Sequence, residues 1–186
     1  MGLRVIGGNL RGKKLKSVHG PMVRPTADRL RESIFNILSF RTQEAVVLDL
    51  FAGTGAFGIE AISRSAEFAT FIDHSKKALS VIAQNISSCD LDRHTKIIKW
   101  DIQKNLNCIQ SFRPAFNLVF MDPPYNRNLI RPALSNLHRS NSLEQNACLV
   151  IEHAQLELIP EDLSEFQLKD QRRYGKTLVS LLNYVV

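Results

Sequence analysis

Apolar segments of strand length alternate with helical patterns between residues 45 and 154 of this 186-residue chain. The strand-like segments are residues 45–51, 67–73, 95–101, 116–122 and 147–154, and helical patterns cover residues 56–65, 75–89 and 129–140. This alternation predicts a parallel sheet with helices on both faces. Two further segments, 165–175 and 176–186, meet at Gly175 and predict a closing antiparallel pair. The expected fold class is therefore α/β, with a mostly parallel seven-stranded sheet and a C-terminal antiparallel hairpin.

Four of the predicted strands end in an acidic residue, namely Asp49, Asp73, Asp101 and Asp122. The carboxyl ends of parallel strands meet at one edge of the sheet, and ligands of open α/β sheets bind there. Carboxylates accept hydrogen bonds from ligand donors and pair with cations. The four acids therefore predict one binding rim.

The loop after the first predicted strand, in DLFAGTGAFG, has the glycine spacing of the dinucleotide fingerprint. Asp73 follows Gly53 by 20 residues, which also fits an acid on a ribose, so a nicotinamide oxidoreductase is one alternative. Asp49 weighs against it, because an unpaired acid would repel a pyrophosphate at this loop. S-adenosylmethionine has no phosphate and carries a positive sulfonium and a positive amino group.

We therefore expect S-adenosylmethionine at this rim. Its amino-acid end would lie near Asp49 and residues 53–55, its ribose hydroxyls at Asp73 and its adenine amine at Asp101. The alternative is a loop whose glycines serve packing only. The expected cofactor-binding residues are Asp49, Phe51, Gly53, Thr54, Gly55, Asp73 and Asp101.

A second motif, FMDPPYNR, follows the fourth predicted strand. Two consecutive prolines fix φ and remove two backbone donors, so this turn presents acceptors beside an aromatic ring. Such acceptors suit the amine of a nucleobase, and the ring suits stacking on an extruded base. The expected catalytic residues are Asp122, Pro123, Pro124 and Tyr125, which would act by positioning and electrostatics. The alternative is a rigid, non-catalytic turn, and these residues alone do not separate guanine N2 from adenine N6 or cytosine N4.

Basic residues are concentrated in the first 41 residues of the chain. That segment holds nine Lys and Arg and two acidic residues, whereas the remainder holds 15 basic and 16 acidic residues. A basic segment on a near-neutral body is typical of contact with a phosphate backbone, and the alternative is a solvated basic surface. The expected nucleic-acid contacts are Arg11, Lys13, Lys14, Arg24, Arg29 and Arg31.

Several stretches resemble known enzymes. VLDLFAGTGAFGIEA followed by VFMDPPY resembles the S-adenosylmethionine-dependent amino-methyltransferases of nucleic acids. RVIGGNLRGKKL, RPTADRLRESIFNIL and YGKTLVSLL resemble the RsmD-type bacterial enzymes, and the resemblance covers nearly the whole chain. Asp73 is often Glu in similar sequences, and either acid can hold ribose hydroxyls.

The resemblance implies a Rossmann-like class I methyltransferase fold with a basic N-terminal extension. Within that extension, the turn residues 7–9 predict a β-hairpin over residues 4–18, and residues 24–40 predict a helix whose apolar stripe excludes Arg29 and Arg31. It also implies methylation of the exocyclic N2 of one guanine in small-subunit (16S) ribosomal RNA, which is the partner it predicts. Residues 122–125 would surround the target base, and the glycine loop, Asp73 and Asp101 would surround the cofactor. We expect residues 1–41 to form the basic extension and residues 42–186 the methyltransferase domain.

Other features limit the remaining classes of function. No apolar run approaches the roughly 18 residues of a membrane span, and the N-terminus lacks a secretory signal pattern. The three cysteines and five histidines show no metal-ligand spacing, so we expect no metal. The cysteines, widely spaced and odd in number, also suggest a reducing cytoplasm. We expect a monomer. A DNA amino-methyltransferase and a non-catalytic RNA-binding assembly factor on the same scaffold remain alternatives. At this length no obvious second domain remains to read a duplex, whereas structured RNA can be recognised by shape.

Overall fold

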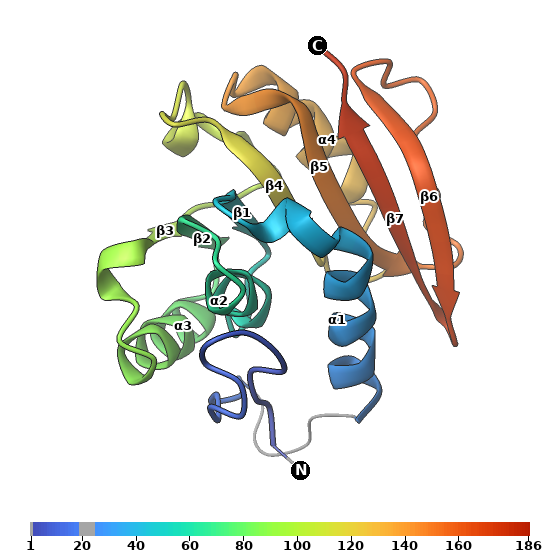
Figure 1. Cartoon of the computed structure of the whole chain (residues 1–186). Helices are drawn as coiled ribbons and strands as arrows, with labels where there is room; N and C mark the ends of the chain where they lie inside the picture. Colours follow the sequence, from blue (N-terminus) through green and yellow to red (C-terminus); the bar gives the residue numbers. More distant parts are fainter. Residues whose placement is uncertain (1, 19–24) are drawn as a thin grey trace.

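A seven-stranded sheet forms the centre of the computed structural model, which describes residues 2–18 and 25–186 (Figure 1). The strands are β1 (Val46–Leu50), β2 (Phe68–Asp73), β3 (Thr95–Lys99), β4 (Phe116–Met121), β5 (Leu143–Ala154), β6 (Phe166–Tyr174) and β7 (Thr177–Tyr184). They lie in the order β3-β2-β1-β4-β5-β7-β6. Pairing is parallel from β3 through β5, and β7 is antiparallel to both β5 and β6. The predicted α/β class and the closing antiparallel pair are confirmed.

Helices cover both faces of the sheet. They are α1 (Pro25–Leu38), α2 (Ala56–Ser63), α3 (Lys76–Ser88) and α4 (Ile130–Arg139), with short 3-10 turns η1 (Ser39–Thr42), η2 (Asp92–His94) and η3 (Asn107–Ile109). On one face α1, α2 and α3 pack on alternate strand residues such as Val47, Phe71 and Phe120. On the other face α4 and η3 pack on the residues between them, such as Leu48 and Met121. The inner strands β1, β2 and β4 are therefore buried on both sides, which explains their continuous apolar sequences.

The N-terminal segment, residues 2–18, forms a hairpin-shaped loop with less strand pairing than the predicted β-hairpin. Its two arms meet in one isolated antiparallel bridge between Arg4 and Lys14, and Leu15 N–H donates to the Leu3 carbonyl at 2.9 Å. Side chains of α2 and α3 satisfy much of the remaining backbone. Leu10 N–H donates to Ser63 Oγ at 2.9 Å and Lys16 N–H donates to Asn85 Oδ1 at 2.7 Å. The loop therefore owes its position to the helices beneath it.

Among the described residues, no helix combines the length and the apolar character needed to cross a membrane.

Candidate active site

Five acidic side chains lie at the carboxyl ends of the parallel strands, in the order of the strands across the sheet. Asp101 follows β3, Asp73 ends β2 and Asp49 is the next-to-last residue of β1. Asp122 follows β4, and Glu152 lies near the end of β5. The four acids predicted from sequence therefore share one rim. Glu152 was not among the predicted residues, although it stands in the apolar run of the next strand.

A cavity of about 630 Å³ opens at this rim. Two predicted groups meet in it, because residues from the glycine loop and from the Asp-Pro-Pro-Tyr turn both contribute to its wall. The N-terminal segment closes another side through Leu3, Ser17 and Val18, joined by Leu30 and Arg31 of α1. The predicted site residues that line it are Asp49, Phe51, Gly53, Thr54, Asp73, Asp122, Pro123, Pro124 and Tyr125.

The glycine loop is held in place by the acid at the end of β2. Asp73 Oδ2 accepts a hydrogen bond from Gly53 N–H at 3.0 Å, and Asp73 Oδ1 accepts one from Ser75 N–H at 2.8 Å. Phe51 has a φ of 58°, a conformation that non-glycine residues rarely adopt and that is enriched at functional sites. Gly55 stands just before α2 with a φ of 75°, which glycine tolerates without strain. Asp73 thus fixes the loop and still faces the cavity.

Asp49 is buried with little compensation. Its Oδ2 accepts a hydrogen bond from Gly58 N–H at 3.0 Å. A Cβ on Gly58 would lie 2.4 Å from the Phe71 ring, so a glycine there allows α2 to approach β2 closely. Burial, together with the negative charge of Asp73, raises the pKa of Asp49 to about 8 against the effect of the Gly58 hydrogen bond. A cationic ligand group would stabilise the ionised form of this carboxyl.

Asp101 lies on the same rim but in a different cavity. It lines a neighbouring hollow of about 390 Å³ together with Trp100 and Asn105. His74 contributes to both cavities and so marks the point where they adjoin. The structure therefore places Asp101 beside the main cavity, and strand β2 separates it from the strand that carries Asp49.

The Asp-Pro-Pro-Tyr turn is anchored to the strand pair beside it. The Tyr125 hydroxyl donates to Glu152 Oε1 at 2.8 Å and lies 3.2 Å from Thr177 Oγ1, at the start of β7. The Tyr125 residue remains 40% exposed, so its ring is accessible from the cavity. Burial of the hydroxyl raises the pKa of Tyr125, so the phenol keeps its proton at neutral pH.

Asp122 is exposed to the cavity, and the charged groups that act on it, Glu152 and Asp49, are both acidic. Loss of hydration and the nearby charges of Glu152 and Asp49 raise its pKa well above the usual range of an aspartate. Burial also raises the pKa of Glu152, which the hydrogen bond from Tyr125 opposes. In the described part of the chain, no hydrogen bond or ion pair engages the Asp122 carboxyl. This side of the cavity therefore offers hydrogen-bond acceptors.

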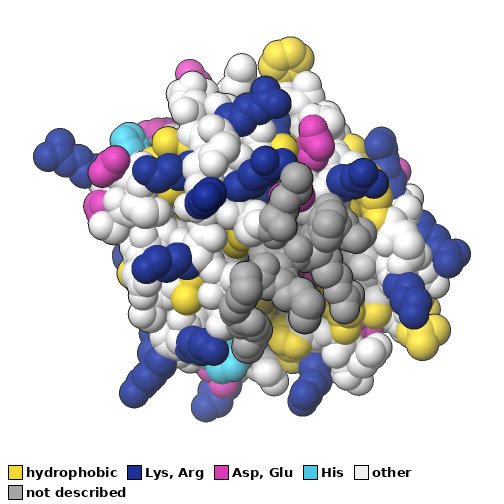
Figure 2. Space-filling view, turned by 90° about the horizontal axis from the view of Figure 1, so that it is seen from below, with side chains coloured by type: hydrophobic (Ala, Val, Ile, Leu, Met, Phe, Trp, Pro, Cys, Tyr) yellow, Lys and Arg dark blue, Asp and Glu magenta, His cyan; other side chains and the backbone are white. Residues whose placement is uncertain are grey.

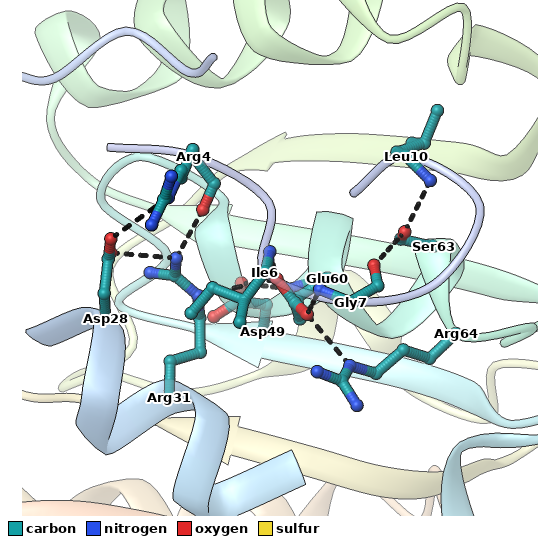
Figure 3. A network of polar contacts seen from close by, with 11 residues as sticks. Arg4, Ile6, Gly7, Leu10, Asp28, Arg31, Asp49, Glu60, Ser63 and Arg64 are labelled. Atoms are coloured by element: carbon teal, nitrogen blue, oxygen red, sulfur yellow. Dashed lines mark hydrogen bonds and ion pairs between the residues drawn. The ribbon is translucent and has the colours of Figure 1, made fainter. Parts of the chain in front are cut away.

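A second group of charged side chains joins α1, α2 and the N-terminal segment, and its acids are paired with arginines (Figure 3). Glu60, buried on α2, accepts hydrogen bonds from Ile6 N–H at 2.8 Å and Gly7 N–H at 2.7 Å. It also accepts a hydrogen bond from Arg64 Nε at 2.8 Å and lies 3.7 Å from Arg31 Nε. The cluster ties the N-terminal segment and α1 to α2.

Arg31 was predicted to contact nucleic acid, but its guanidinium is paired inside the protein. Its side chain is 5% exposed, and its Nη2 donates to the Arg4 carbonyl at 2.6 Å and to Asp28 Oδ1 at 3.2 Å. Burial lowers the pKa of Arg31, and the carboxylates of Glu60 and Asp28 oppose that effect. The guanidinium is therefore used to hold the N-terminal segment, and Figure 3 shows it reaching from α1 toward Arg4 and Asp28.

Four other predicted nucleic-acid contacts are exposed, namely Arg11, Lys13, Lys14 and Arg29. Figure 2 shows the face that carries the N-terminal segment, where many Lys and Arg side chains are spread and acidic side chains are fewer. The tip of the segment lies over the end of α2, because Asn9 N–H donates to the Ser63 carbonyl at 2.7 Å. Arg24 lies outside the described residues.

Asn85 joins the N-terminal segment to the glycine loop. This buried residue of α3 receives the Lys16 N–H and donates from Nδ2 to the Lys16 carbonyl at 3.1 Å. The same Nδ2 donates to the Thr54 carbonyl at 2.9 Å. One side chain therefore sets the position of the segment relative to the loop, a link that no local sequence pattern reveals.

The strand order, the glycine loop after β1 and the acid that ends β2 define a Rossmann-like methyltransferase fold. Among solved structures, yhhF from Escherichia coli matches with a TM-score of 0.86 at 29% identity, and the match covers 98% of each chain.

Sequence comparison identifies the family within this class. YlbH of Bacillus subtilis is 33% identical over 179 residues, which cover 96% of this chain and 97% of YlbH. Ribosomal RNA small subunit methyltransferase D of Escherichia coli K12 is 35% identical over 150 residues, which cover 81% of this chain and 74% of that protein. The family model described as Conserved hypothetical protein 95 matches residues 3–183. The chain belongs to this family, and the RsmD-type resemblance is confirmed.

Proposed function

We propose that this protein is an S-adenosylmethionine-dependent methyltransferase that modifies the exocyclic N2 of a guanine in small-subunit (16S) ribosomal RNA. One observation carries the proposal: Asp122 and Tyr125 line the same cavity as Asp49 and Asp73. An amine-holding turn and a cation-binding rim thus face one space. The relatives named ribosomal RNA small subunit methyltransferase D support ribosomal RNA as the substrate.

The donor set of the rim fits S-adenosylmethionine. Asp49 is a buried acid whose pKa is raised to about 8, so a nearby cation would offset an existing electrostatic cost. The phosphates of a dinucleotide would add negative charge to the same place, which disfavours the oxidoreductase alternative. When bound, S-adenosylmethionine supplies a methyl group on a sulfonium, open to direct attack by a nitrogen lone pair.

On the cofactor side, each acid has a distinct role in this proposal. Asp49 favours the positive amino-acid end, and Asp73 accepts hydrogen bonds from ribose hydroxyls while it fixes the loop through Gly53. Asp101 serves the adenine amine from the adjoining hollow. Phe51, Gly53 and Thr54 supply the wall and backbone groups around these contacts.

On the target side, Asp122 and the carbonyls of the Pro-Pro turn accept the two N–H groups of the amine. These hydrogen bonds draw the nitrogen lone pair out of conjugation with the ring and orient it. The raised pKa of Asp122 suits it to take the proton that the amine releases on methylation. Tyr125 stacks on the extruded base, with its hydroxyl anchored at Glu152.

The basic surface binds RNA phosphates in this proposal. Arg11, Lys13, Lys14 and Arg29 supply exposed cations on the N-terminal segment and α1. Arg31 is removed from the expected set because its guanidinium is paired inside the protein.

Labelled methyl transfer tests the proposed function. The protein would be incubated with labelled S-adenosylmethionine and either naked RNA or small-subunit particles from cells lacking it, followed by nucleoside analysis. We expect label in N2-methylguanine from small-subunit RNA. Label in N6-methyladenine or N4-methylcytosine would contradict the proposal, and no transfer to either substrate would favour the non-catalytic alternative.

A further inference from the structure

Glu152 lies next to the proposed amine-holding residue on the adjacent strand. Met121 of β4 pairs with Ile151 of β5, so Asp122 and Glu152 each follow a paired position. Both side chains line the cavity. Glu152 is close enough for its charge to raise the pKa of Asp122.

One oxygen of Glu152 is already used and the other remains available. Oε1 accepts the hydrogen bond from the Tyr125 hydroxyl at 2.8 Å, which fixes the orientation of the carboxyl. Within residues 2–18 and 25–186, no hydrogen bond or ion pair engages Oε2. The side chain is partly exposed at the cavity wall. A fixed acceptor therefore faces the space beside Asp122.

The three exocyclic amines that the Asp-Pro-Pro-Tyr turn can hold differ at the neighbouring ring nitrogen. In guanine the carbon that carries the N2 amine is bonded to two ring nitrogens, N3, an acceptor, and N1–H, a hydrogen-bond donor. In adenine the nitrogen beside N6 is N1, and in cytosine the nitrogen beside N4 is N3, and both are acceptors. An acceptor fixed next to Asp122 thus meets a donor only when the base is guanine.

We propose that Glu152 reads this ring nitrogen and so selects guanine, accepting a hydrogen bond from N1–H while Asp122 holds the N2 amine. The inference rests on the proposed function and extends it to the choice of base. With adenine or cytosine, the ionised carboxylate would face the lone pair of the ring nitrogen, and no hydrogen bond would form between them. A site built around a hydrogen bond to a substrate N–H discriminates strongly against a base that lacks it.

The surroundings of Glu152 suit this role. Burial raises its pKa, and a donor N–H from the base would favour the ionised carboxylate that accepts it. The Tyr125 hydroxyl couples the two parts of the pocket, because the ring that stacks on the base also orients the carboxyl that reads its edge. A base inserted at the wrong depth would therefore lose both contacts.

The test uses RNA in which the target guanine, located by mapping the labelled methyl group along the RNA, is replaced by 2-aminopurine. This base keeps the amine at C2 but has an acceptor at N1. We expect the wild-type protein to methylate guanine with a kcat/KM roughly 10- to 100-fold above that for 2-aminopurine, the range for one specific base contact. Equal rates on the two bases would overturn the proposal without any variant.

Glu152→Gln then assigns the discrimination to this residue. The amide oxygen can still accept the Tyr125 hydrogen bond, and the amide NH2 can donate to the N1 acceptor of 2-aminopurine. We expect the preference for guanine to fall by roughly 10-fold or more, with cofactor affinity unchanged. An unchanged preference in a folded Glu152→Gln protein would overturn the role of Glu152.

A control on the same strand is available. Glu144→Gln changes an exposed carboxyl at the amino end of β5 and should leave the preference unchanged. The product of the wild-type protein on natural RNA separates the two levels of failure. A methylated adenine or cytosine would contradict both the proposed function and this inference, whereas N2-methylguanine with no discrimination against 2-aminopurine would contradict the inference alone.

Discussion

Two buried acids of this protein, Glu60 and Asp49, differ in how far other residues of the protein compensate their negative charge. Glu60 receives two backbone N–H groups and lies against the guanidinium groups of Arg31 and Arg64. Asp49, equally buried, receives the N–H of Gly58, and its pKa rises to about 8. Other residues of the protein compensate the charge of Glu60, whereas ionisation of the buried Asp49 carries an electrostatic cost.

The difference separates structural from functional charge. A buried ion pair with its hydrogen bonds satisfied holds elements together, and Glu60 joins the N-terminal segment, α1 and α2. Acids without a protein cation, such as Asp49 and Asp122, are instead arranged for a ligand that brings donors or positive charge. The four predictions that follow test the two halves of this comparison, from the largest expected effect to the smallest.

Glu60→Gln should destabilise the fold most. It would leave the buried Arg31 guanidinium with Asp28 but without Glu60, and removing one partner of a buried ion pair costs about 3–5 kcal/mol in comparable cases. We expect the thermal midpoint to fall by roughly 10 °C, measured by circular dichroism. The double variant Glu60→Gln, Arg31→Met should recover much of the loss, because it removes the unpaired charge. A Glu60→Gln midpoint equal to that of the wild type would show that the cluster is not structural.

Asp122→Ala should remove activity without affecting the fold. Loss of one positioned group that acts on developing charge typically lowers kcat by about 100- to 1,000-fold. S-adenosylmethionine affinity, measured by calorimetry, should stay the same, because Asp122 faces the target side of the cavity. Normal turnover in this variant would remove Asp122 from the catalytic site.

Asp49→Asn should weaken S-adenosylmethionine binding by roughly 10-fold or more, the range for a hydrogen bond or contact to a charged group. The same change should stabilise the ligand-free protein at high pH. Because the folded-state pKa of Asp49 is raised, its favourable contribution is present below about pH 4 and is lost as the pH rises through about 8.

The stability difference between Asp49→Asn and wild type should therefore grow between pH 5 and pH 9, by at most about 1.4 kcal/mol per pH unit. Denaturant unfolding of the two proteins without ligand measures it. A difference that stays constant over this range would mean that Asp49 is ionised in the ligand-free protein, as a compensated acid would be.

A triple variant in which Arg11, Lys13 and Lys14 are each replaced by Gln should have the smallest effect on the fold. It should act on RNA binding alone. Each lost phosphate contact should lower the slope of log affinity against log salt by about 0.7 to 0.9. A matched triple, Arg93, Arg113 and Arg139 to Gln, removes three exposed cations near the amino ends of β3, β4 and β5. If both triples change the slope equally, the N-terminal segment is not the specific contact.

The strands, the rim and its acids were predictable because each depends on local pattern and on the geometry of parallel strands. The lengths of the apolar runs identified β1 to β4, and Asp49 and Asp122 followed from where those runs end. The adjoining position of Asp101 depends on how Trp100 packs, which the sequence does not display.

The roles of Arg31 and Glu152 depend on distant partners. Arg31 lies off the apolar stripe of α1, which indicated exposure, but Glu60 on another helix compensates its burial. Glu152 stands within a continuous apolar run, where an acid gives no periodic signal, and only the pairing of β4 with β5 brings it beside Asp122. The N-terminal β-hairpin was overestimated for a similar reason, because helix side chains supply hydrogen bonds that a ladder would otherwise make.

Proton release on cofactor binding tests most directly the claim that the rim acids are balanced by the ligand. Calorimetric titration with S-adenosylmethionine at pH 7, in buffers of different ionisation enthalpy, counts the protons exchanged. With a pKa of about 8 before binding, Asp49 should release about 0.9 proton as it becomes ionised. We expect wild type to release that amount more than Asp49→Asn. Equal proton release by the two proteins would contradict the account.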